Sequence, residues 1–321
     1  MRSILAEKGF TKPAVKDPLI QMSTSILARC AFMVLWTLAV SALHAAPPQV
    51  FAPKPLSEEE LVYNWDPQSN LGPATWGSRY PACQTGPARV QSPIALTGQG
   101  SLEGTLTYAY KSYSDTVRNT GHGILLPVGS PRAAGSIRLD NGPLYYFVEF
   151  HVHTRSEHTI DGVMQDLEVH MVHSDDGTMT GHLAVIAVLF RKVNQGGNQA
   201  VSQLINHAPS SPGQGGRITV DPSHLLSQNG NSVYYEYGNG SLTTPECGPV
   251  AVWLVGRTLG TVDTAAVDHL EALVRRFKDN PGSYNLNNRP IDAGATTSIR
   301  FVQGTSKHHI STKEPKKLAH K

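Results

Sequence analysis

A group of histidines at alternating positions is the feature of this sequence that most constrains its fold. Five of the 14 histidines lie between His151 and His173. His151 and His153 end the segment 144–153 (LYYFVEFHVH), whose aromatic and β-branched residues are typical of a strand. Because residues i and i+2 of a strand share one face, we expect these two imidazoles to lie side by side. A sheet that contains this strand therefore presents two nitrogen ligands on one face.

A third histidine can join this pair from a second strand-like segment. His170 lies within 167–173 (LEVHMVH), and pairing of the two segments would bring it beside His151 and His153. Three neutral imidazoles that leave a fourth position open form the ligand set of a catalytic zinc site. No cysteine lies nearby in the sequence, which argues against a closed structural zinc site.

Each of the two segments also has a carboxylate two residues before a candidate ligand. Glu149 precedes His151, and Glu168 precedes His170. Each carboxylate therefore shares a strand face with its histidine. Metal-bound imidazoles commonly donate their second N–H to a carboxylate. We predict that Glu149 and Glu168 orient these two ligands.

Two other interpretations of the histidines stay open on the residues alone. One is a histidine network in the core that binds no metal. The other is a cupin, a jelly-roll metal protein, whose first motif resembles His151 and His153 followed by Glu157. The second cupin motif, which contains Gly and Pro and ends in a ligand histidine, has no convincing counterpart after Leu183.

Composition and periodicity favour one β-rich domain. The chain has 29 glycines and 22 prolines among 321 residues and few charged helical segments, which favours strands and loops over a helical bundle. Strand-like patterns cover 101–110, 144–153, 166–173, 183–190, 232–237 and 251–255. Helical patterns cover 199–207 and 264–278, the second with Thr264 as its expected cap and Asn280-Pro281-Gly282 as its end.

The first 45 residues have the organisation of an export signal. Fourteen uncharged residues, 30–43, follow Arg29 and lead into the small residues around Ala45. The segment is shorter than the about 20 apolar residues of a membrane span. We predict a signal peptide over 1–45, cleaved near Ala45, with Met22 as a second candidate initiator because the basic start is long. An uncleaved membrane anchor is the alternative.

Export to an oxidising compartment affects how the cysteines are interpreted. Cys30 leaves with the signal peptide, and Cys83 and Cys247 remain. Two cysteines in an exported domain suggest one disulfide, and two free buried thiols are the alternative. We expect the mature protein to be periplasmic or secreted, without a membrane span after signal cleavage.

The charge of the chain is concentrated at its ends. Its net charge is +2, with +3 in 1–45, +4 in 306–321 and −5 in the residues between. This distribution gives no overall basic character for nucleic acid. We predict a loose leader over 46–62, one domain over 63–305, and a basic disordered tail over 306–321 that is either solvated, in contact with anionic lipid or polymer, or a recruiter of metal ions.

The segments around the histidines resemble the α-class carbonic anhydrases. Segments 149–162 (EFHVHTRSEHTIDG) and 167–173 (LEVHMVH) are similar to that family's FHxH, SEHxxDG and ELHxVH motifs at the same spacing. Further similar segments follow in the family's order over 63–305: Trp65 to Trp76 with Gly72-Pro73, 91–94, 119–122, 183–185, 241–245, Trp253 and 287–290. Cys83 and Cys247 match the disulfide of exported members.

The resemblance implies a fold and an activity. The fold is a single, mainly β domain with a central, largely antiparallel twisted sheet, short peripheral helices, and zinc at the base of a conical cleft. His151, His153 and His170 would bind Zn²⁺. The activity is reversible hydration of carbon dioxide to bicarbonate and a proton by zinc-bound hydroxide. The alternative is a catalytically inactive binding domain of the same fold. An oligomer is compatible with either.

The resemblance also assigns roles around the metal. Thr243 would accept a hydrogen bond from the hydroxide and donate to an ionised Glu157. His122 would carry the proton to buffer, and His158 with Tyr237 would form a buried network behind the site. The substrate side would be formed by Thr244, Val172, Val185, Leu242, Ala251 and Trp253.

Six positions depart from the family's usual residues; Thr154 and Asp292 bear on packing, and the other four bear on the chemistry. Glu149 stands where Gln is common. Pro67 stands where a Tyr often orders the water chain, and Thr120 and Leu125 replace polar Asn positions beside it. The resemblance therefore predicts a thinner water network and slower proton transfer through His122.

Overall fold

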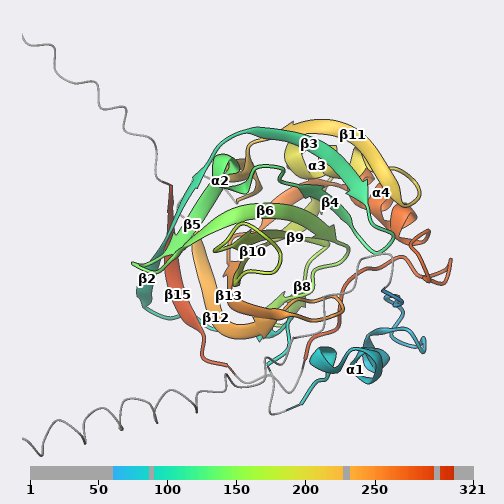
Figure 1. Cartoon of the computed structure of the whole chain (residues 1–321), viewed down its shortest axis with the longest axis horizontal. Helices are drawn as coiled ribbons and strands as arrows, with labels where there is room; N and C mark the ends of the chain where they lie inside the picture. The colour runs from blue at the N-terminus through green and yellow to red at the C-terminus, as the bar shows by residue number, and fades with distance from the viewer. Residues whose placement is uncertain (1–60, 87–89, 227–231, 293–296, 307–321) are drawn as a thin grey trace, which may run out of the picture. The chain divides into compact units, whose positions relative to one another are not determined.

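The computed structural model describes residues 61–86, 90–226, 232–292 and 297–306 (Figure 1). These residues all belong to one compact unit, Pro55–Lys321. The predicted signal peptide, the leader up to residue 60 and the tail from residue 307 lie outside the described residues. Leu61, near the end of the predicted leader, is buried. Within the described ranges, no helix combines the length and the apolar character needed to cross a lipid bilayer.

Most of the described residues that are in regular structure belong to one twelve-stranded sheet. Its strands are β2 Leu102–Tyr110, β3 Tyr113–Asn119, β4 Ile124–Pro127, β5 Gly135–Leu139, β6 Leu144–His153, β9 Leu167–Ser174, β10 Leu183–Val193, β11 Gly213–Val220, β12 Val233–Ser241, β13 Pro249–Gly256, β14 Gly260–Asp263 and β15 Arg300–Ser306. A small second sheet consists of β1 Ala95–Leu96, β7 Thr159–Ile160 and β8 Val163–Met164.

The helical elements are short and few. They are η1 Pro73–Thr75, α1 Trp76–Arg79, η2 Pro81–Cys83, α2 Pro131–Ala134, α3 Gln199–Asn206, η3 Pro222–Leu225 and α4 Thr264–Val274. Figure 1 shows α3 and α4 on one side of the strands, behind β3 and β11. The predicted fold class, a mainly β domain with short peripheral helices, is confirmed.

The large sheet curls back on itself. Its strands follow the order β11-β3-β4-β6-β5-β2-β15-β12-β13-β10-β14, and β9 pairs with both β6 and β10. The hydrogen-bonded pairs therefore run in a ring from β6 through β5, β2, β15, β12, β13, β10 and β9 back to β6 (Figure 1). Only the pairs β10–β13, β10–β14 and β15–β2 are parallel among the described strands of this sheet. The strongly twisted sheet holds the histidine-bearing strands β6 and β9 between further strands on both sides.

Helix α4 differs from its sequence prediction at both ends. It begins at Thr264, but Asp263 is the residue at the cap position, and the Thr264 hydroxyl instead donates to the Val193 carbonyl (3.1 Å). The helix ends at Val274, four residues earlier than predicted. The N–H of Phe277 donates to the Val274 carbonyl (3.0 Å), so the chain continues in a tighter i to i+3 turn there.

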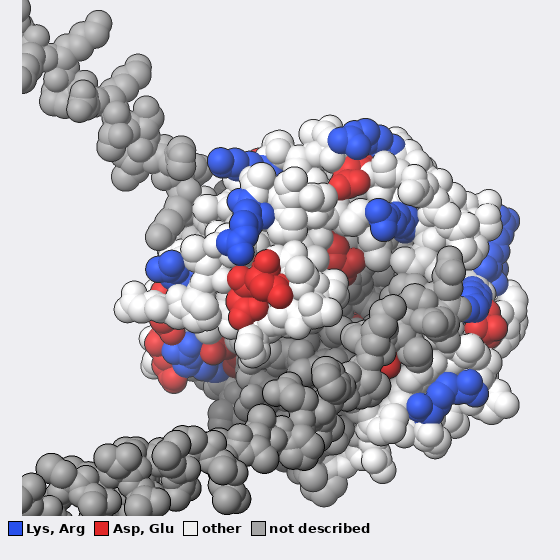
Figure 2. Space-filling view, in the orientation of Figure 1, with Lys and Arg blue, Asp and Glu red and all other residues white. Residues whose placement is uncertain are grey.

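Charged side chains on the face shown in Figure 2 are interspersed, with basic and acidic groups close to one another. Arg300 pairs with Asp140 (2.9 Å) and Glu236 (2.6 Å), and Lys192 lies 3.6 Å from Asp268. Pairs of this kind near the surface contribute little to stability. The stability of the fold therefore depends mainly on the apolar interior of the curled sheet.

The predicted disulfide joins Cys83 and Cys247 across 164 residues of sequence. It connects the end of η2 to the loop that follows β12. Two main-chain hydrogen bonds fix the same loop, from the N–H of Leu242 to the Gly248 carbonyl and from the N–H of Cys247 to the Thr244 carbonyl (both 2.7 Å). The loop 242–248 is thus held from several directions.

Replacing both cysteines by serine (Cys83→Ser with Cys247→Ser) should lower the free energy of unfolding by about 2–5 kcal/mol, because the unfolded chain gains entropy when a long loop opens. Urea unfolding of the full chain measures this. A reductant should bring the unmodified protein to the stability of the double variant and leave the variant unchanged. Equal stability of the oxidised protein and the variant would contradict the prediction.

His173 is a buried histidine on β9, and its side chain points to the opposite side of the strand from that of the candidate ligand His170. Its Nε2 is hydrogen bonded to the Tyr110 hydroxyl (2.8 Å), and its ring packs against Phe147. Burial lowers the pKa of His173 to about 3, although main-chain hydrogen bonds oppose the shift. This imidazole is therefore neutral in the folded protein over the whole neutral range.

The titration of His173 predicts acid sensitivity of the fold. Between about pH 6.5 and 3 the unfolded imidazole binds a proton and the folded one does not, so stability falls as the pH falls through that window. One such group contributes at most about 1.4 kcal/mol per pH unit. His173→Gln should make the plot of unfolding free energy against pH shallower by up to one proton, measured by urea unfolding from pH 7 to 4.5. An unchanged slope would show that this histidine is not a source of the acid sensitivity.

Candidate metal centre

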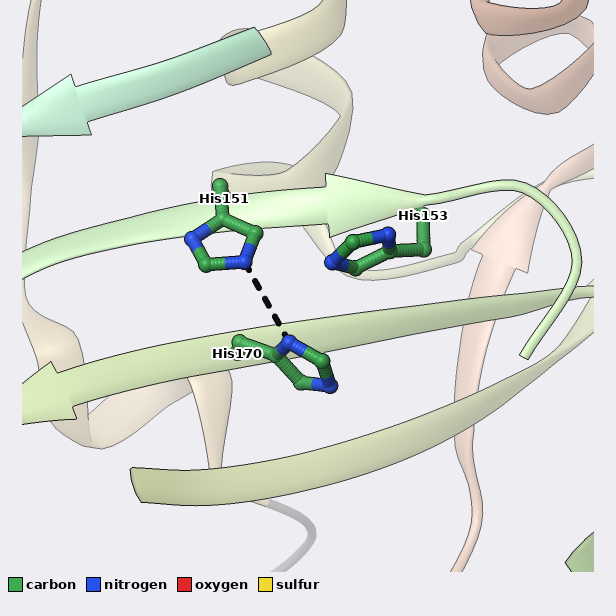
Figure 3. Close-up of side chains that lie close together, drawn as sticks. All are labelled: His151, His153 and His170. Carbon is green, nitrogen blue, oxygen red and sulfur yellow. Dashed lines mark hydrogen bonds between the residues drawn. The ribbon is translucent and has the colours of Figure 1, made fainter. Parts of the chain in front are cut away.

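The three predicted ligand histidines converge on one face of the sheet. β6 and β9 are antiparallel neighbours in which His151 lies opposite His170, and residues opposite one another point to the same face. Figure 3 shows His151 and His153 on β6 with His170 facing them from β9. The ring centroids lie 4.9, 5.1 and 4.6 Å apart. The strand pairing thus brings His170 beside His151 and His153, although His170 lies 17 or more positions later in the sequence.

The facing nitrogen atoms form a set that fits a metal ion. One nitrogen from each of His151, His153 and His170 lies within 4.8 Å of the others. His170 Nδ1 and His151 Nε2 are 3.2 Å apart. His153 Nε2 is buried and has no hydrogen-bond partner among the described residues. A buried nitrogen without a partner, facing two other imidazoles, is the environment that a metal ion would complete.

The second nitrogen of each imidazole is already hydrogen bonded. His151 Nδ1 lies 2.7 Å from Glu149 Oε1, and His170 Nε2 lies 2.7 Å from Glu168 Oε1. His153 Nδ1 lies 2.7 Å from the main-chain carbonyl of Asn287. Such contacts fix the tautomer and the orientation of a ligand histidine. The nitrogens that face one another are therefore His151 Nε2, His153 Nε2 and His170 Nδ1.

Two of these imidazoles are kept neutral. Burial lowers the pKa of His153 well below its ordinary value, and the neighbouring imidazoles of His170 and His151 lower it further. Burial also lowers the pKa of His170 to about 4, against the opposing effect of Glu168. Because only neutral imidazole can bind a metal, protons compete weakly for these two ligands at neutral pH.

Glu168 is a fully buried carboxylate that four donors surround. Its Oε2 accepts from the N–H groups of Glu157 and His158 (both 2.9 Å), and its Oε1 lies 2.7 Å from His158 Nδ1 as well as from His170. Burial alone would raise the pKa of Glu168, but His158 and His170 lower it well below the ordinary value. A carboxylate held in this way remains ionised and locks the orientation of His170.

Glu157 has the opposite electrostatic situation. Burial raises its pKa well above the ordinary value, and the Glu168 charge raises it further. The N–H of Arg289 donates to Glu157 Oε1 (2.7 Å), which opposes the shift. The Thr243 hydroxyl lies close enough to lower the pKa of Glu157 as well, although Glu157 Oε2 has no partner of hydrogen-bond geometry in the described residues.

His158 and Tyr237 form the buried contact that the resemblance suggested. His158 Nε2 lies 2.7 Å from the Tyr237 hydroxyl, which donates to Ser92 Oγ (2.9 Å). His158, Glu168 and His170 are also close enough to form a second metal-ligand group. Their facing atoms are already bonded to one another, so this group functions as a hydrogen-bond network that supports the three facing imidazoles.

A cavity of about 350 Å³ opens beside the imidazoles. Val172, Leu242 and Thr244 line it, as predicted for the substrate side. Val185 and Trp253 are buried in the apolar cluster behind Val172. Ala251 is exposed and is not among the described residues that line the cavity. The structure thus places three of the six predicted substrate residues at the cavity, two behind it and one apart from it.

His122 lines the same cavity, but the chain covers it. It is 2% exposed, and its ring stacks on Tyr63 at 4.0 Å between centroids. Trp65 Nε1 donates to its carbonyl (3.1 Å). Thr120 and Leu125 line the cavity too, whereas Pro67 lines a different cavity. Tyr63 and Trp65 line the cavity beside His122.

Several residues of the site escaped the sequence analysis. The main-chain carbonyl of Asn287 is hydrogen bonded to His153, and the main-chain N–H of Arg289 donates to Glu157. Any residue type can make such contacts, so the sequence does not indicate them. Their segment 287–290 was part of the resemblance, which was the available signal. Tyr63 and Trp65 have the i, i+2 spacing of residues on one face, and that spacing could have identified both as one aromatic surface.

Comparisons with known proteins agree with this geometry. Residues 71–302 match the family model for eukaryotic-type carbonic anhydrase. Alpha carbonic anhydrase 3 of Arabidopsis thaliana is 32% identical over 249 residues, which cover 73% of this chain and 82% of that protein. Dioscorin DB3L of Dioscorea polystachya is 32% identical over 261 residues, 78% of this chain and 90% of that protein. The structure of α-carbonic anhydrase from Thermovibrio ammonificans with the inhibitor sulfanilamide is 26% identical with a TM-score of 0.60, covering 75% of this chain and 98% of that chain.

The contacts of Glu168 predict its effect on metal affinity. Glu168→Gln replaces an acceptor oxygen by an N–H donor that faces other donors, and should weaken Zn²⁺ binding about 10- to 100-fold. Competition with a chromogenic chelator measures the affinity. Asp166→Asn is the matched control, since Asp166 lies two residues away and its carboxylate accepts from the N–H of Lys192 (2.7 Å). Equal affinities of the two variants would contradict a role of Glu168 in holding His170.

Proposed function

We propose that this chain, which belongs to the α-carbonic anhydrase family, uses Zn²⁺ held by His151, His153 and His170 to hydrate carbon dioxide reversibly to bicarbonate and a proton. The supporting observation is the convergence of three imidazoles. Each turns one nitrogen toward the other two rings, and its second nitrogen is hydrogen bonded to a carboxylate or a carbonyl. The cavity beside them is wide enough for a small substrate and partly apolar. The ligand count and the donor type fit zinc with one open position.

His151, His153 and His170 would hold Zn²⁺, and such an ion would supply a nucleophile near neutral pH by lowering the pKa of water. The residues of this chain prepare the site for that chemistry. Glu149, Glu168 and the Asn287 carbonyl each hold one ligand in its metal-binding tautomer. The lowered pKa values of His153 and His170 keep both ligands neutral.

Thr243 and Glu157 are the proposed orienting pair. A Thr243 hydroxyl that donates to the Glu157 carboxylate has only lone pairs left for the cavity side. Its oxygen would then accept a hydrogen bond from the attacking O–H group, which turns a lone pair of the attacking oxygen toward the substrate. Burial and Glu168 favour the protonated form of Glu157. A dication at the histidines favours the ionised form, which is the form this role requires.

The apolar side of the cavity is the proposed carbon dioxide subsite. Val172 and Leu242 offer aliphatic surface next to the imidazoles, and Thr244 borders it. Carbon dioxide has no net dipole, so such surface binds it without a cost of desolvating polar groups. Val185 and Trp253 support this wall from behind, since both pack in the same cluster as Val172.

His122 remains the proposed proton carrier, because it lines the cavity beside the three imidazoles. Tyr63 and Trp65 cover it, and Leu125 offers no hydrogen bond to water. We therefore propose that proton transfer, rather than attack on carbon dioxide, limits turnover at low buffer concentration.

We also propose that the protein is exported, with a signal peptide over 1–45, a leader over 46–62, the catalytic domain over 63–305 and a basic tail over 306–321. The disulfide is consistent with an oxidising compartment. The periplasm and the exterior are both compatible with it.

Stopped-flow carbon dioxide hydration by the purified chain tests the proposed function. Activity should disappear after zinc removal and return on addition of one Zn²⁺ per chain. Thr243→Val should lower kcat/KM for hydration about 100-fold or more, since it removes a group that orients a proton in the transition state.

Thr219→Val is the matched control. Thr219 lies on β11, where its hydroxyl contacts Ser114 Oγ (2.7 Å), and its loss should leave hydration unchanged. A chain that binds one zinc and shows no hydration would exclude the enzyme and favour the inactive binding domain.

A further inference from the structure

A single row of residues crosses the sheet from the candidate metal centre to its rim. Antiparallel pairing places Arg118 of β3 opposite Leu125 of β4, Leu125 opposite His151 of β6, and His151 opposite His170 of β9. Residues opposite one another share a face, so all four side chains lie on the metal-facing side. Arg118, Leu125 and His151 accordingly line one cavity.

The spacing of the row separates a cation from the metal centre by one apolar residue. Neighbouring strands lie about 4.8 Å apart, so the Cα atoms of Arg118 and His151 are roughly 10 Å apart. Leu125 lies between them, and Pro127 adds apolar surface on the same side of β4. A ligand that spans this distance meets a guanidinium at one end and aliphatic carbon along its body.

The guanidinium of Arg118 is available for such a ligand. Arg118 is exposed, and its side chain has no hydrogen bond or ion pair within the part of the chain that the structure describes. A planar guanidinium matches a carboxylate with two parallel hydrogen bonds. This exposed guanidinium lines the cavity.

The charges of the cavity also set the direction of the ligand. Among the described lining residues, the one carboxylate side chain is that of Glu149, at the end near His151. Its carboxylate repels an anion there, whereas Arg118 attracts one at the rim. The cavity volume of about 350 Å³ exceeds the roughly 150 Å³ that suffices for a benzene ring. One ring or a short alkyl chain therefore fits between the two charges.

We propose that Arg118, Leu125 and Pro127 form a subsite for a small organic carboxylate, with its anionic group on Arg118 and its apolar body over Leu125. The occupant covers the mouth of the cavity and obstructs entry to the metal centre. Binding itself does not require zinc. Only its consequence, inhibition of hydration, rests on the proposed function.

Binding to the metal-free full chain at pH 8 tests the subsite. Phenylacetate and its neutral isostere phenylacetamide are titrated by ligand-observed NMR at low ionic strength. We expect phenylacetate to bind about three- to tenfold more tightly, a range set by a partly exposed charged hydrogen bond.

Variants separate Arg118 from general electrostatics. Arg118→Leu should abolish the preference for the carboxylate, and Arg118→Lys should retain part of it as a point charge. Arg191→Leu is the matched control, because Arg191 is exposed on β10 beyond the stretch that pairs with β9. It should leave the preference unchanged. Retention of the full preference in Arg118→Leu, or an equal loss in Arg191→Leu, would overturn the proposal.

A zinc-loaded arm distinguishes failure of the subsite from failure of the enzyme. In that arm phenylacetate should inhibit hydration, and Arg118→Leu should raise the inhibition constant by the same three- to tenfold factor. Carboxylate binding that depends on Arg118 in a chain without hydration keeps the subsite and excludes the enzyme. Hydration with inhibition that ignores Arg118 keeps the enzyme and excludes the subsite.

Discussion

The antiparallel register between β6 and β9 is the constraint on which the site depends. It sets His151 opposite His170 and places His153 two residues further along the same face. A slip by one residue would turn the histidines of one strand to the other side of the sheet. The register is protected because both strands have further partners, β4 and β5 beside β6 and β10 beside β9. A shift of either strand would break its hydrogen bonds to the neighbours on both sides, so the register is fixed.

The second constraint is the buried charge of Glu168. An isolated buried carboxylate is costly, and this one is offset by two main-chain N–H groups and two imidazoles. The same contacts orient His170 and His158. One carboxylate therefore connects the turn after β6, a ligand histidine and the network that runs through Tyr237 to Ser92. Because this region is closed to solvent, water could not replace a lost partner, and removal of any partner would leave the Glu168 charge undercompensated.

The sequence was informative where the chemistry depends on side chains with short, regular spacing. The i, i+2 histidines and the glutamates two residues before them were identifiable on β6 and β9 because alternation in a strand is rigid. The six strand-like segments overlap β2, β6, β9, β10, β12 and β13, but β3, β4, β5, β11, β14 and β15 of the large sheet were missed. The glycines and polar residues of β11 (GQGGRITV) give no alternating pattern, and β4 and β14 have only four residues each. Main-chain contacts could not be predicted from the sequence either. The Asn287 carbonyl and the Arg289 N–H depend on where the chain passes, and the burial of His122 depends on Tyr63, which is distant in sequence.

Two buried glutamates with opposite pKa shifts make the metal centre incomplete without a cation. Glu168 is ionised by its four donors, and its charge helps to keep the neighbouring Glu157 protonated. The imidazoles between them are neutral, so they do not offset a second negative charge. A dication bound by the three nitrogens would supply that compensation and allow both carboxylates to ionise. Under the proposed function, metal binding, proton release from Glu157 and the orientation of Thr243 would form one linked equilibrium, and the bound ion would stabilise the folded chain.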